Sequence, residues 1–541
     1  MKIALAQLNY HIGNFEANTA KILKSIADAK KDQADLIVFA ELAIGGYPAK
    51  DLLRSTVFLD SCEQAIDTIA EACTDIACII GAPIRNTSQK GKSLFNAALF
   101  IENGAVTHIA KKGLLPDYDV FDEYRYFEPA IDFSCLTFKG IKIALTICED
   151  LWNMENINSY VINPIDMLAE ENPSLIINIA ASPFSYTHFE ERKKILIKQA
   201  QTYKLPLLYV NQVGAHTDII FDGRSLVFNE QGEQLLELAA FQEDLQYYEV
   251  GDSVAATPVD FSEIALIHQA LVLGLRDYFS KSGFKKAVLG LSGGLDSAIV
   301  AALACEALGA ENVFAVLMPS IYSSDHSIKD ALDLVKNTGC KHQIIPIKDV
   351  ANAFEHILAP TFQGLAADTT EENIQARTRG TLLMAISNKM GYILLNTSNK
   401  SEAAVGYGTL YGDMAGAISV IGDVYKTQAF ALARYINRER EIIPVNTIVK
   451  PPSAELRPDQ KDSDSLPEYE VLDALLHGFI ENEKSGSELV ALGYNPALVQ
   501  RIARLVNNAE FKRFQCPPIL RVSPKAFGAG RTIPLVAKYP F

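Results

Sequence analysis

Short apolar runs alternate with segments of helical periodicity along most of this chain, and this alternation limits the possible folds more than any other feature. In residues 1–250 the predicted helices include Ala17–Lys30 and Phe189–Gln201. The predicted strands include Ile3–Leu8, Leu36–Ala40, Ile141–Ile147, Leu175–Ala180 and Leu207–Val210. Strands and helices that alternate in this way are typical of α/β folds.

A second block of the same kind follows a polar stretch, Gly251–Val259, which we interpret as a linker. The block begins with a strand, a glycine-rich turn and a helix, and further strands and helices follow. The predicted elements are the strand Ala287–Leu291, the helix Ser297–Leu308, the strand Val313–Met318, a helix ending near Gly339 and the strand Ile344–Ile347. This order predicts a doubly wound parallel sheet. We therefore expect one domain over residues 1–250, a linker over 251–262 and a second domain over 263–541. Two polar segments, Gln363–Glu372 and Ser453–Glu468, are expected to be mobile loops.

Composition excludes several classes of protein. A chain of 541 residues with 49% hydrophobic residues predicts more than one globular core. Its net charge of −16 argues against nucleic-acid binding. No apolar run approaches the roughly 20 residues that span a bilayer, and the first residues do not read as a secretion signal. Eight cysteines without paired spacing fit neither a disulfide framework nor a zinc site, so we expect a cytoplasmic protein.

Three residues of the first domain together suggest amide hydrolysis. Glu41 and Cys148 each follow an apolar strand, where α/β sheets place their chemistry, and Lys112 precedes a proline-containing turn. Each alone has an ordinary structural explanation, since most cysteines are small core residues and most charged residues are solvated. Amide cleavage, however, needs a nucleophile, a base and a cation for the oxyanion. Cys148, Glu41 and Lys112 can fill these roles, and a nearby lysine is expected to favour the thiolate.

Four segments of this domain resemble the landmarks of nitrilase-type amidases that serve as glutaminase domains. They are FAELAIGGYP, KKGLLPDYDVFDEYRYF, LTICEDLW and NIAASPF. The resemblance implies an α-β-β-α sandwich and catalytic roles for Glu41, Lys112 and Cys148. It adds Glu123 as an orienting carboxylate and places Tyr118 and Ser182 beside glutamine. The usual basic partner of the substrate carboxylate is His188 here, with Arg192 one helical turn further on. Lys111 is expected to be inert, because neighbours on a strand point to opposite faces.

The second domain carries the string SGGLDS between a strand and a helix. Glycines allow backbone N–H groups to surround a phosphate, and the helix N-terminus adds partial positive charge. The string resembles the pyrophosphate loop of N-type ATP pyrophosphatases, which form AMP and pyrophosphate through an adenylate. The resemblance implies that ATP contacts Gly290, Leu291, Ser292, Gly293, Gly294, Leu295, Asp296 and Ser297. Asp296 is also expected to bind Mg²⁺ on the phosphates.

Longer segments of the second domain resemble NAD synthetase. They are ENIQARTRG, LLNTSNKSE, GYGTLYGDMAGAISVIGDVYKTQ, PPSAELRPDQKDSDSLPEYE and FKRFQCPPILRVSPKAFGAGR. The resemblance implies that Thr397 contacts ATP and that Glu402 binds Mg²⁺ and deamido-NAD. Asn373 and Lys512 are expected to contact deamido-NAD, Asp413 and Lys426 to line the site, and Arg377 or Arg379 to meet phosphate. After Glu510 the chain has lysines and arginines but no acidic residue, which suits a substrate with phosphates.

We therefore expect a two-site ligase that takes ammonia from L-glutamine and uses ATP to amidate deamido-NAD, the last step of NAD biosynthesis. The family implies at least a homodimer through the synthetase domain, and two sites on one chain suggest an internal path for ammonia. Neither nucleic acid nor membrane is an expected partner. Two alternatives stay open at this point. One is an amidase fused to an ATP pyrophosphatase that acts on another acid, and the other is a nucleotide-binding regulatory protein without turnover.

Overall fold

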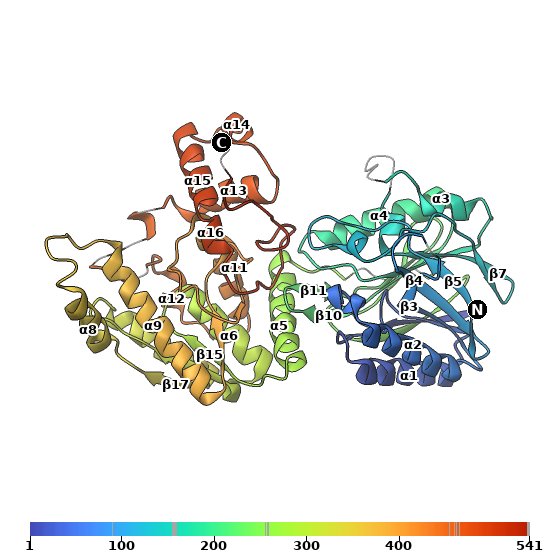
Figure 1. Ribbon diagram of the computed structural model, residues 1–541, viewed down its shortest axis with the longest axis horizontal. Coiled ribbons are helices and arrows are strands. Elements are labelled where there is room, and N and C mark those ends of the chain that lie inside the picture. Colours follow the sequence, from blue (N-terminus) through green and yellow to red (C-terminus); the bar gives the residue numbers. More distant parts are fainter. Residues whose placement is uncertain are drawn as a thin grey trace. The chain divides into compact units, whose positions relative to one another are not determined.

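The chain divides into two compact units, Met1–Asp260 and Phe261–Phe541. The computed structural model describes residues 1–88, 90–153, 160–254, 256, 259–453, 455–458, 460, 462–464 and 466–537. Parts of the predicted linker and of the second predicted loop lie outside the described residues, namely Ala255, Thr257, Pro258, Ala454, Asp459, Lys461 and Ser465. Each unit is described by itself below (Figure 1).

The first unit contains two six-stranded sheets and a hairpin. One sheet has the order β14-β1-β2-β3-β4-β5 and the other the order β13-β12-β9-β8-β7-β6. The first sheet comprises β1 Lys2–Gln7, β2 Leu36–Val38, β3 Ala77–Arg85, β4 Leu94–Glu102, β5 Ala105–Lys111 and β14 Asp244–Glu249. The second comprises β6 Leu136–Phe138, β7 Ile141–Ile147, β8 Leu175–Ala180, β9 Leu207–Asn211, β12 Leu226–Phe228 and β13 Gln234–Glu237. The hairpin pairs β10 Val213–His216 with β11 Ile219–Asp222.

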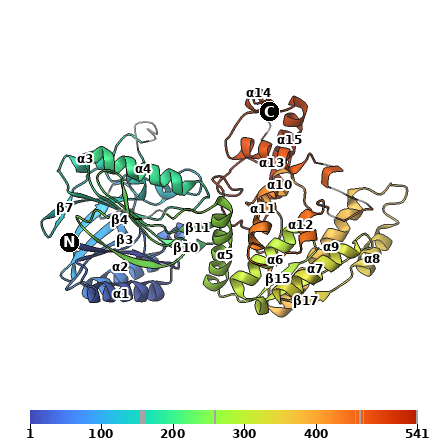
Figure 2. The ribbon, with the colours of Figure 1, turned by 180° about the vertical axis from the view of Figure 1, so that it is seen from behind.

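Helices cover the outer face of each sheet (Figures 1 and 2). The helices α1 (Phe15–Lys31) and α2 (Thr56–Ala72) lie on one side, and α3 (Pro164–Ala169) and α4 (His188–Tyr203) lie on the other. Alternation along β1 explains the layers, because Ala4 and Ala6 pack in the core under α1 and α2, whereas Ile3 and Leu5 pack in the core between the sheets. This arrangement confirms the predicted α-β-β-α sandwich.

The second unit is built on a five-stranded parallel sheet with the order β17-β16-β15-β18-β19. The strands are β15 Ala287–Gly290, β16 Val313–Leu317, β17 Lys341–Ile344, β18 Ile393–Asn396 and β19 Ile418–Ser419. Helix α6 (Leu295–Leu308) packs against β15 and β16, and α9 (Thr369–Met390) packs against β15 and β18. The predicted doubly wound parallel sheet is thus confirmed.

The predicted strand Ile344–Ile347 is wrong by three residues, since β17 covers Lys341–Ile344. Among the described strands, β17 pairs with β16 alone, so it lies at the edge of the sheet, and its four residues are exposed and mostly polar. The apolar signal came from Ile345 and Ile347, which pack into the core after the strand has ended.

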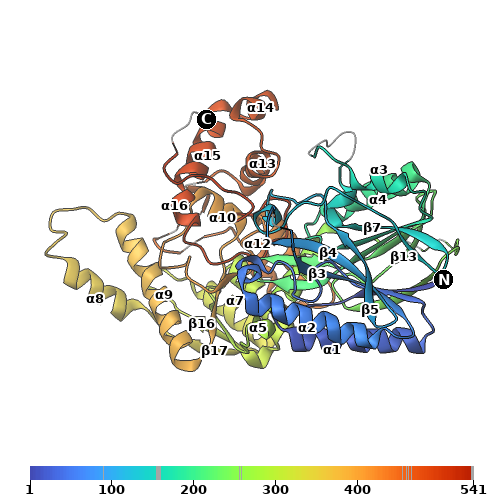
Figure 3. The ribbon, with the colours of Figure 1, turned by 45° about the vertical axis from the view of Figure 1, so that its right-hand side comes forward.

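Further helices surround the sheet. They are α5 Glu263–Lys281, α7 Asp325–Thr338, α8 Lys348–Leu358, α10 Lys400–Val405, α11 Lys426–Ile436, α12 Val445–Val449, α13 Tyr469–Ile480, α14 Gly486–Ala491, α15 Pro496–Asn508 and α16 Glu510–Arg513. The last four gather in one cluster (Figure 3), where Leu472, Leu476 and Ile502 form part of a separate core. The predicted loop Gln363–Glu372 ends earlier than expected. Asp368 caps α9, and the last four residues of the predicted loop, 369–372, form the first turn of that helix. No helix among the described residues is long and apolar enough to cross a membrane.

Candidate active sites

The strand ends of the first unit bring a lysine and two glutamates into one buried cluster. The Lys112 ammonium donates to Glu41 Oε1 at 2.7 Å and to the two Glu123 oxygens at 2.8 and 2.9 Å. All three side chains are at most 5% exposed. Glu41 follows β2 and Lys112 follows β5, so both come from the same sheet. Three residues that the sequence placed far apart thus form a single buried ion cluster.

Additional donors fix the two carboxylates. The Asn96 amide donates to Glu41 Oε1 at 2.7 Å and to Glu123 Oε2 at 3.2 Å, and the Tyr47 hydroxyl donates to Glu123 at 3.0 Å. The backbone N–H of Ala181 donates to Glu41 Oε2 at 3.0 Å. Sequence reasoning missed Asn96 and Tyr47. Asn96 lies in the middle of β4, and nothing in its local sequence signals a functional role.

Cys148 begins a 3₁₀ turn directly after β7, in the second sheet, with φ of 42°. This left-handed conformation is uncommon for a residue with a side chain and is typical of functional turns. The carbonyl of Cys148 accepts from Asn178 Nδ2 at 3.3 Å. The thiol is buried and lies close enough to Glu41 and Lys112 for their charges to act on it.

The surroundings of Cys148 favour the neutral thiol in the resting protein, whereas we expected Lys112 to favour the thiolate. Burial raises the pKa of the Cys148 thiol well above its ordinary value, and the charge of Glu41 raises it further. Lys112 lowers the pKa as expected, but it does not outweigh these two effects. Burial also raises the pKa of Glu123 to about 7, against the opposing effect of Lys112. A neutral thiol beside a carboxylate needs that carboxylate as a base.

Lys111 and Lys112 face opposite sides, as predicted. Lys111 is exposed and its ammonium lies 4.2 Å from the centre of the Phe95 ring, whereas Lys112 is buried in the cluster. This alternation is that of an extended strand.

The predicted glutamine ligands form two groups near Cys148. The Tyr118 hydroxyl donates to both oxygens of Glu149, at 3.0 and 3.1 Å, and Tyr160 donates to the same carboxylate at 3.0 Å. Ser182 Oγ lies 3.0 Å from His188 Nε2. The His188 ring is stacked on Trp152 with centroids 5.2 Å apart.

Arg192 is not available to a substrate. It is fully buried and forms an ion pair with Asp222 at 2.8 Å, so it is a structural residue. Glu149 was missed by sequence reasoning, although it directly follows Cys148. Burial raises the pKa of its carboxyl, and it is the acidic side chain that meets both tyrosines.

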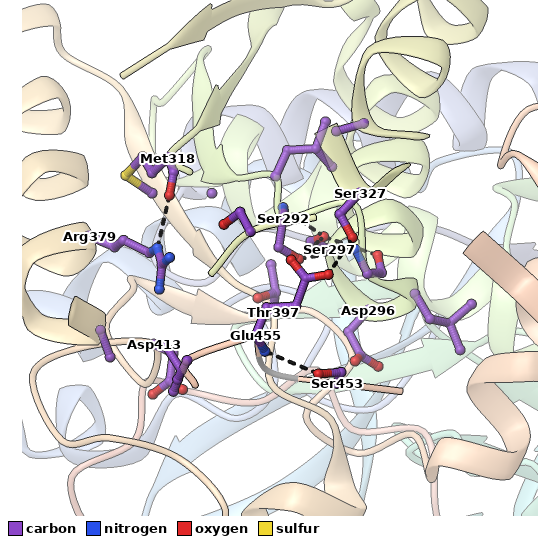
Figure 4. Close-up of a pocket in the computed structure, with 18 of the residues that line it drawn as sticks. Ser292, Asp296, Ser297, Met318, Ser327, Arg379, Thr397, Asp413, Ser453 and Glu455 are labelled. Atoms are coloured by element: carbon purple, nitrogen blue, oxygen red, sulfur yellow. Dashed lines mark hydrogen bonds between the residues drawn. The ribbon is translucent and has the colours of Figure 1, made fainter. Parts of the chain in front are cut away.

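In the second unit the strand order reverses between β15 and β18, and a pocket of about 590 Å³ lies at this switch point. Residues following both strands line it, among them Ser292, Asp296 and Thr397 (Figure 4). The predicted ATP contacts that line the pocket are Gly290, Leu291, Ser292, Gly294, Leu295, Asp296, Ser297 and Thr397.

Gly293 is required by packing rather than by the pocket. Its φ is 83°, and a Cβ there would lie 2.1 Å from the carbonyl oxygen of Ser327. The loop therefore packs tightly on α7, and only glycine fits. Ser292 Oγ accepts the Gly294 N–H at 3.1 Å and lies 3.1 Å from Ser297 Oγ, which fixes the turn.

Asp296 and Glu402 meet at a common cation. The Lys426 ammonium lies 2.6 Å from Asp296 Oδ2 and 3.2 Å from Glu402 Oε1. Asn399 donates to Asp296 at 3.1 Å and accepts the N–H of Glu402 at 2.9 Å. Burial raises the pKa of Glu402 to about 8, against the effect of Lys426. Two carboxylates and a lysine thus face the phosphate loop together.

The other predicted residues gather beside the pocket. Asn373 accepts from Thr409 Oγ1 at 2.7 Å, and Asp413 accepts the Thr409 N–H at 2.6 Å. The Lys512 ammonium donates to the carbonyls of Gly406 and Gly408 at 2.8 and 2.7 Å. Asn373 from α9 and Lys512 from α16 thus both contact the loop 406–413, which contributes Asp413 to the pocket wall.

The two candidate arginines of α9 differ in position. Arg379 lines the pocket and donates to the Met318 carbonyl at 3.1 Å (Figure 4). Arg377 is exposed and donates to the carbonyl of Leu410 at 3.2 Å. Of the two, Arg379 is therefore the one placed to meet a ligand in the pocket.

Comparison with known families agrees with both halves of this description. Residues 2–259 match the carbon-nitrogen hydrolase family, and residues 267–516 match the NAD synthase family. Fold and sites thus define a nitrilase-type hydrolase unit joined to a nucleotide-binding synthase unit.

Full-length relatives make the assignment more specific. The chain is 46% identical to the glutamine-dependent NAD(+) synthetase of Synechocystis sp., over 99% of both chains. It is 41% identical to that of Acinetobacter baylyi, over 99% of this chain and 98% of the relative. The structure of the Acinetobacter baumannii enzyme in complex with ADP has a TM-score of 0.79 at 39% identity, covering 99% of this chain and 98% of that one. The enzyme of Cytophaga hutchinsonii shares the fold, with a TM-score of 0.85 at 22% identity and the same coverage. This chain belongs to the glutamine-dependent NAD(+) synthetases.

Proposed function

We propose that this chain amidates deamido-NAD with ammonia from L-glutamine, consuming ATP and releasing AMP and pyrophosphate. Its family is one of C–N ligases in which glutamine is the amide donor. The observation that carries the proposal is the presence on one chain of two clusters of charged side chains, one in each unit. One is the Lys112 cluster beside Cys148, and the other is the phosphate loop with Asp296, Glu402 and Lys426.

At the glutaminase site, Cys148 is the nucleophile and Glu41 the base. Glu41 accepts the thiol proton as sulfur attacks the amide carbon, and Lys112 stabilises the oxyanion. Collapse of the tetrahedral intermediate breaks the C–N bond, and Glu41 returns the proton to the departing ammonia. Water, activated by Glu41, then hydrolyses the thioester to glutamate. Glu123 holds Lys112 in place throughout, supported by its two short contacts with the ammonium.

Glutamine is bound at its two charged ends. Ser182 and His188 face the carboxylate, and Tyr118 with Glu149 faces the ammonium. The buried Glu149 carboxylate supports the second assignment, since a cation is its natural partner. For the first, the 3.0 Å contact of Ser182 Oγ with His188 Nε2 brings a hydroxyl and an imidazole together.

At the synthetase site, the loop from Gly290 to Ser297 binds the phosphates of ATP and Thr397 contacts the nucleotide. The residues present fit a magnesium ion, because Asp296 and Glu402 converge within contact of one ammonium. The described residues contain no group of three or more acidic, histidine or cysteine ligands. Mg²⁺ commonly takes one or two carboxylates, with phosphate oxygens completing the shell. Bound there, the ion would neutralise charge on the phosphates. Asp296 and Glu402 would hold it, while Lys426 would balance their charge.

Deamido-NAD is held by Asn373, Glu402 and Lys512, beside the loop 406–413. Its nicotinate carboxylate attacks the α-phosphate of ATP, pyrophosphate leaves, and ammonia then displaces AMP from the adenylate. A cytoplasmic location and an assembly of at least two copies through the synthetase domain stay predictions.

Product analysis tests this function. The Cys148→Ala variant is assayed for NAD and AMP with deamido-NAD, ATP and Mg²⁺, supplied with either glutamine or ammonium. Loss of the nucleophile should reduce glutamine-supported NAD formation by at least roughly 10³-fold. Ammonium-supported formation should stay near the wild-type rate, because the thiol is needed only to release ammonia. Loss of both activities in a folded variant, or wild-type AMP formation with other carboxylic acids in place of deamido-NAD, would contradict the proposal.

A further inference from the structure

Asp150 lies two residues after Cys148, in the same 3₁₀ turn, and is only 2% exposed. Among the described residues, the Asp150 carboxylate forms no hydrogen bond with Lys112 or Glu41. Burial raises its pKa to about 7, although three backbone N–H groups oppose that effect. A buried carboxylate two residues after a candidate nucleophile requires a structural or functional reason.

The three hydrogen bonds of Asp150 connect two separate segments. Oδ1 accepts the N–H of Gly113 at 3.0 Å and that of Leu114 at 2.9 Å, and Oδ2 accepts the N–H of Ile147 at 3.0 Å. Gly113 and Leu114 directly follow Lys112, at the end of β5 in the first sheet. Ile147 directly precedes Cys148, at the end of β7 in the second sheet.

These contacts join the backbone on either side of the reaction centre. We propose that Asp150 is a positioning residue that fixes Cys148 relative to Lys112 by tying their two strand ends together. The inference rests on the proposed glutaminase function and deepens it, because it says how two sheets hold one catalytic geometry. Asp150 itself touches neither the substrate nor the reacting atoms.

The left-handed backbone of Cys148 makes such a tie necessary. A residue with a side chain holds φ of 42° only when its surroundings impose it. Asn178 secures the carbonyl of Cys148, and Asp150 secures the N–H that precedes it. Without the second contact, the turn can relax and move the sulfur away from the ammonium of Lys112.

A carboxylate is specifically suited to this position. Both of its oxygens accept, so one binds two N–H groups and the other binds the third. Asparagine offers one oxygen only, and its NH₂ group would face a backbone donor. Asp150→Asn therefore keeps the size of the side chain but breaks one of the two connections.

The test compares Asp150→Asn with wild type in the full-length protein. We expect kcat for glutamine hydrolysis to fall by about 10–100-fold, since small displacements of reacting groups cost up to about 10² in rate. KM for glutamine should stay within about twofold, because Tyr118, Ser182 and His188 are untouched. The rate of alkylation of Cys148 by iodoacetamide at fixed pH should also change, because the displaced thiol meets the charges of Glu41 and Lys112 at different distances.

Asp35→Asn is the matched control. Asp35 also accepts a backbone N–H, that of Lys2 at 2.7 Å, in the same unit but in a different segment. It should leave kcat, KM and alkylation unchanged. Asp150→Glu serves as a second variant, because it keeps the charge and both oxygens but shifts them by one methylene. Asp150→Glu should lower kcat in the same way. It provides the test if Asp150→Asn does not fold.

Several outcomes decide the matter. A wild-type kcat in either folded Asp150 variant would overturn the inference and leave the proposed function standing. Equal losses of glutamine-supported and ammonium-supported NAD formation would also overturn it, because they indicate general damage. Absence of glutaminase activity in the wild type would instead refute the proposed function.

Discussion

The Lys112 ammonium is buried, and burial of an ammonium is costly unless opposite charges surround it. Burial alone would lower its pKa, but Glu123 and Glu41 raise that pKa well above the ordinary value. The lysine is therefore cationic at every pH at which the protein works. A permanent cation beside a neutral thiol suits an oxyanion that appears only during the reaction.

The raised pKa of the Cys148 thiol gives a prediction at the residue scale. Because the thiol stays protonated to higher pH, the rate of its alkylation should rise about tenfold per pH unit from pH 7 to 9, without a plateau. Free cysteine, with a pKa of about 8.5, should level off in this range. Mass spectrometry of the Cys148 peptide after timed iodoacetamide exposure measures the rate. A plateau below pH 8 would show that a thiolate is present at rest.

Asp296 gives a second prediction at this scale. Asp296→Asn removes one of the two carboxylates at Lys426 but keeps the shape of the side chain. AMP formation should fall by at least about 10–100-fold with either nitrogen source, because loss of an outer-shell partner alone costs that much and Asp296 would hold the ion directly. Residual glutamine hydrolysis should survive, since Cys148, Glu41 and Lys112 are untouched. Wild-type AMP formation by this variant would exclude Asp296 from the mechanism.

Sequence alone could predict those site residues that follow apolar strands. Glu41 and Cys148 do so, and Asp296 follows a strand and a glycine-rich turn. Asn96 could not be predicted, because its position beside Glu41 exists only once β4 pairs with its neighbours. Asp150 accepts from Leu114 and Gly113, which lie 36 and 37 positions before it in the chain, so no local sequence pattern signals its role.

At the scale of elements, the segment around Glu455 is anchored to the start of α7. Glu455 Oε1 accepts from Ser324 Oγ at 2.7 Å and from Ser327 Oγ at 2.8 Å, and Oε2 accepts the Ser324 N–H at 3.2 Å. Figure 4 shows Glu455 at the pocket beside Ser327. Negative charge at a helix N-terminus is favourable, so this contact holds the segment against the pocket wall that it helps to form.

Removal of that charge should loosen the segment. Glu455→Gln should raise KM for ATP by about two- to fivefold, the equivalent of about 0.3–1 kcal/mol for a charge at a helix N-terminus. Glu468→Gln is the control, because Glu468 is exposed at the far end of the same loop. Initial rates of AMP formation against ATP concentration measure the effect. An unchanged KM in Glu455→Gln would show that the contact does not support nucleotide binding.

Elements differ in how well the sequence predicted them, and their surroundings explain why. The buried strands β7 and β8 have the bounds predicted for them, since continuous apolar runs mark them. The edge strand β17 was misplaced because its exposed side chains are polar. The cluster of α13, α14, α15 and α16 was not predicted as a separate core. Its helices are short, and their apolar faces meet residues such as Val405 and Tyr425 from distant segments.

At the scale of the whole molecule, two sites with different chemistry share one chain. Ammonia is the product of one site and a substrate of the other. In neutral water it becomes mostly ammonium, which has no lone pair with which to attack an adenylate. A path that excludes water would keep the ammonia neutral. Such a path also calls for coupling, because glutamine hydrolysis without a waiting adenylate wastes the amide donor.

An isotope competition measures whether ammonia passes directly between the sites. The enzyme receives unlabelled glutamine together with excess ¹⁵N-ammonium, at a pH where direct use of ammonium is slow. Internal transfer predicts NAD with little ¹⁵N, and glutamate and NAD in nearly equal amounts. Cys148→Ala provides the calibration, because every NAD amide that it forms must come from the labelled pool. If wild-type NAD carries the isotopic composition of that pool as well, ammonia equilibrates with solvent and no internal path operates.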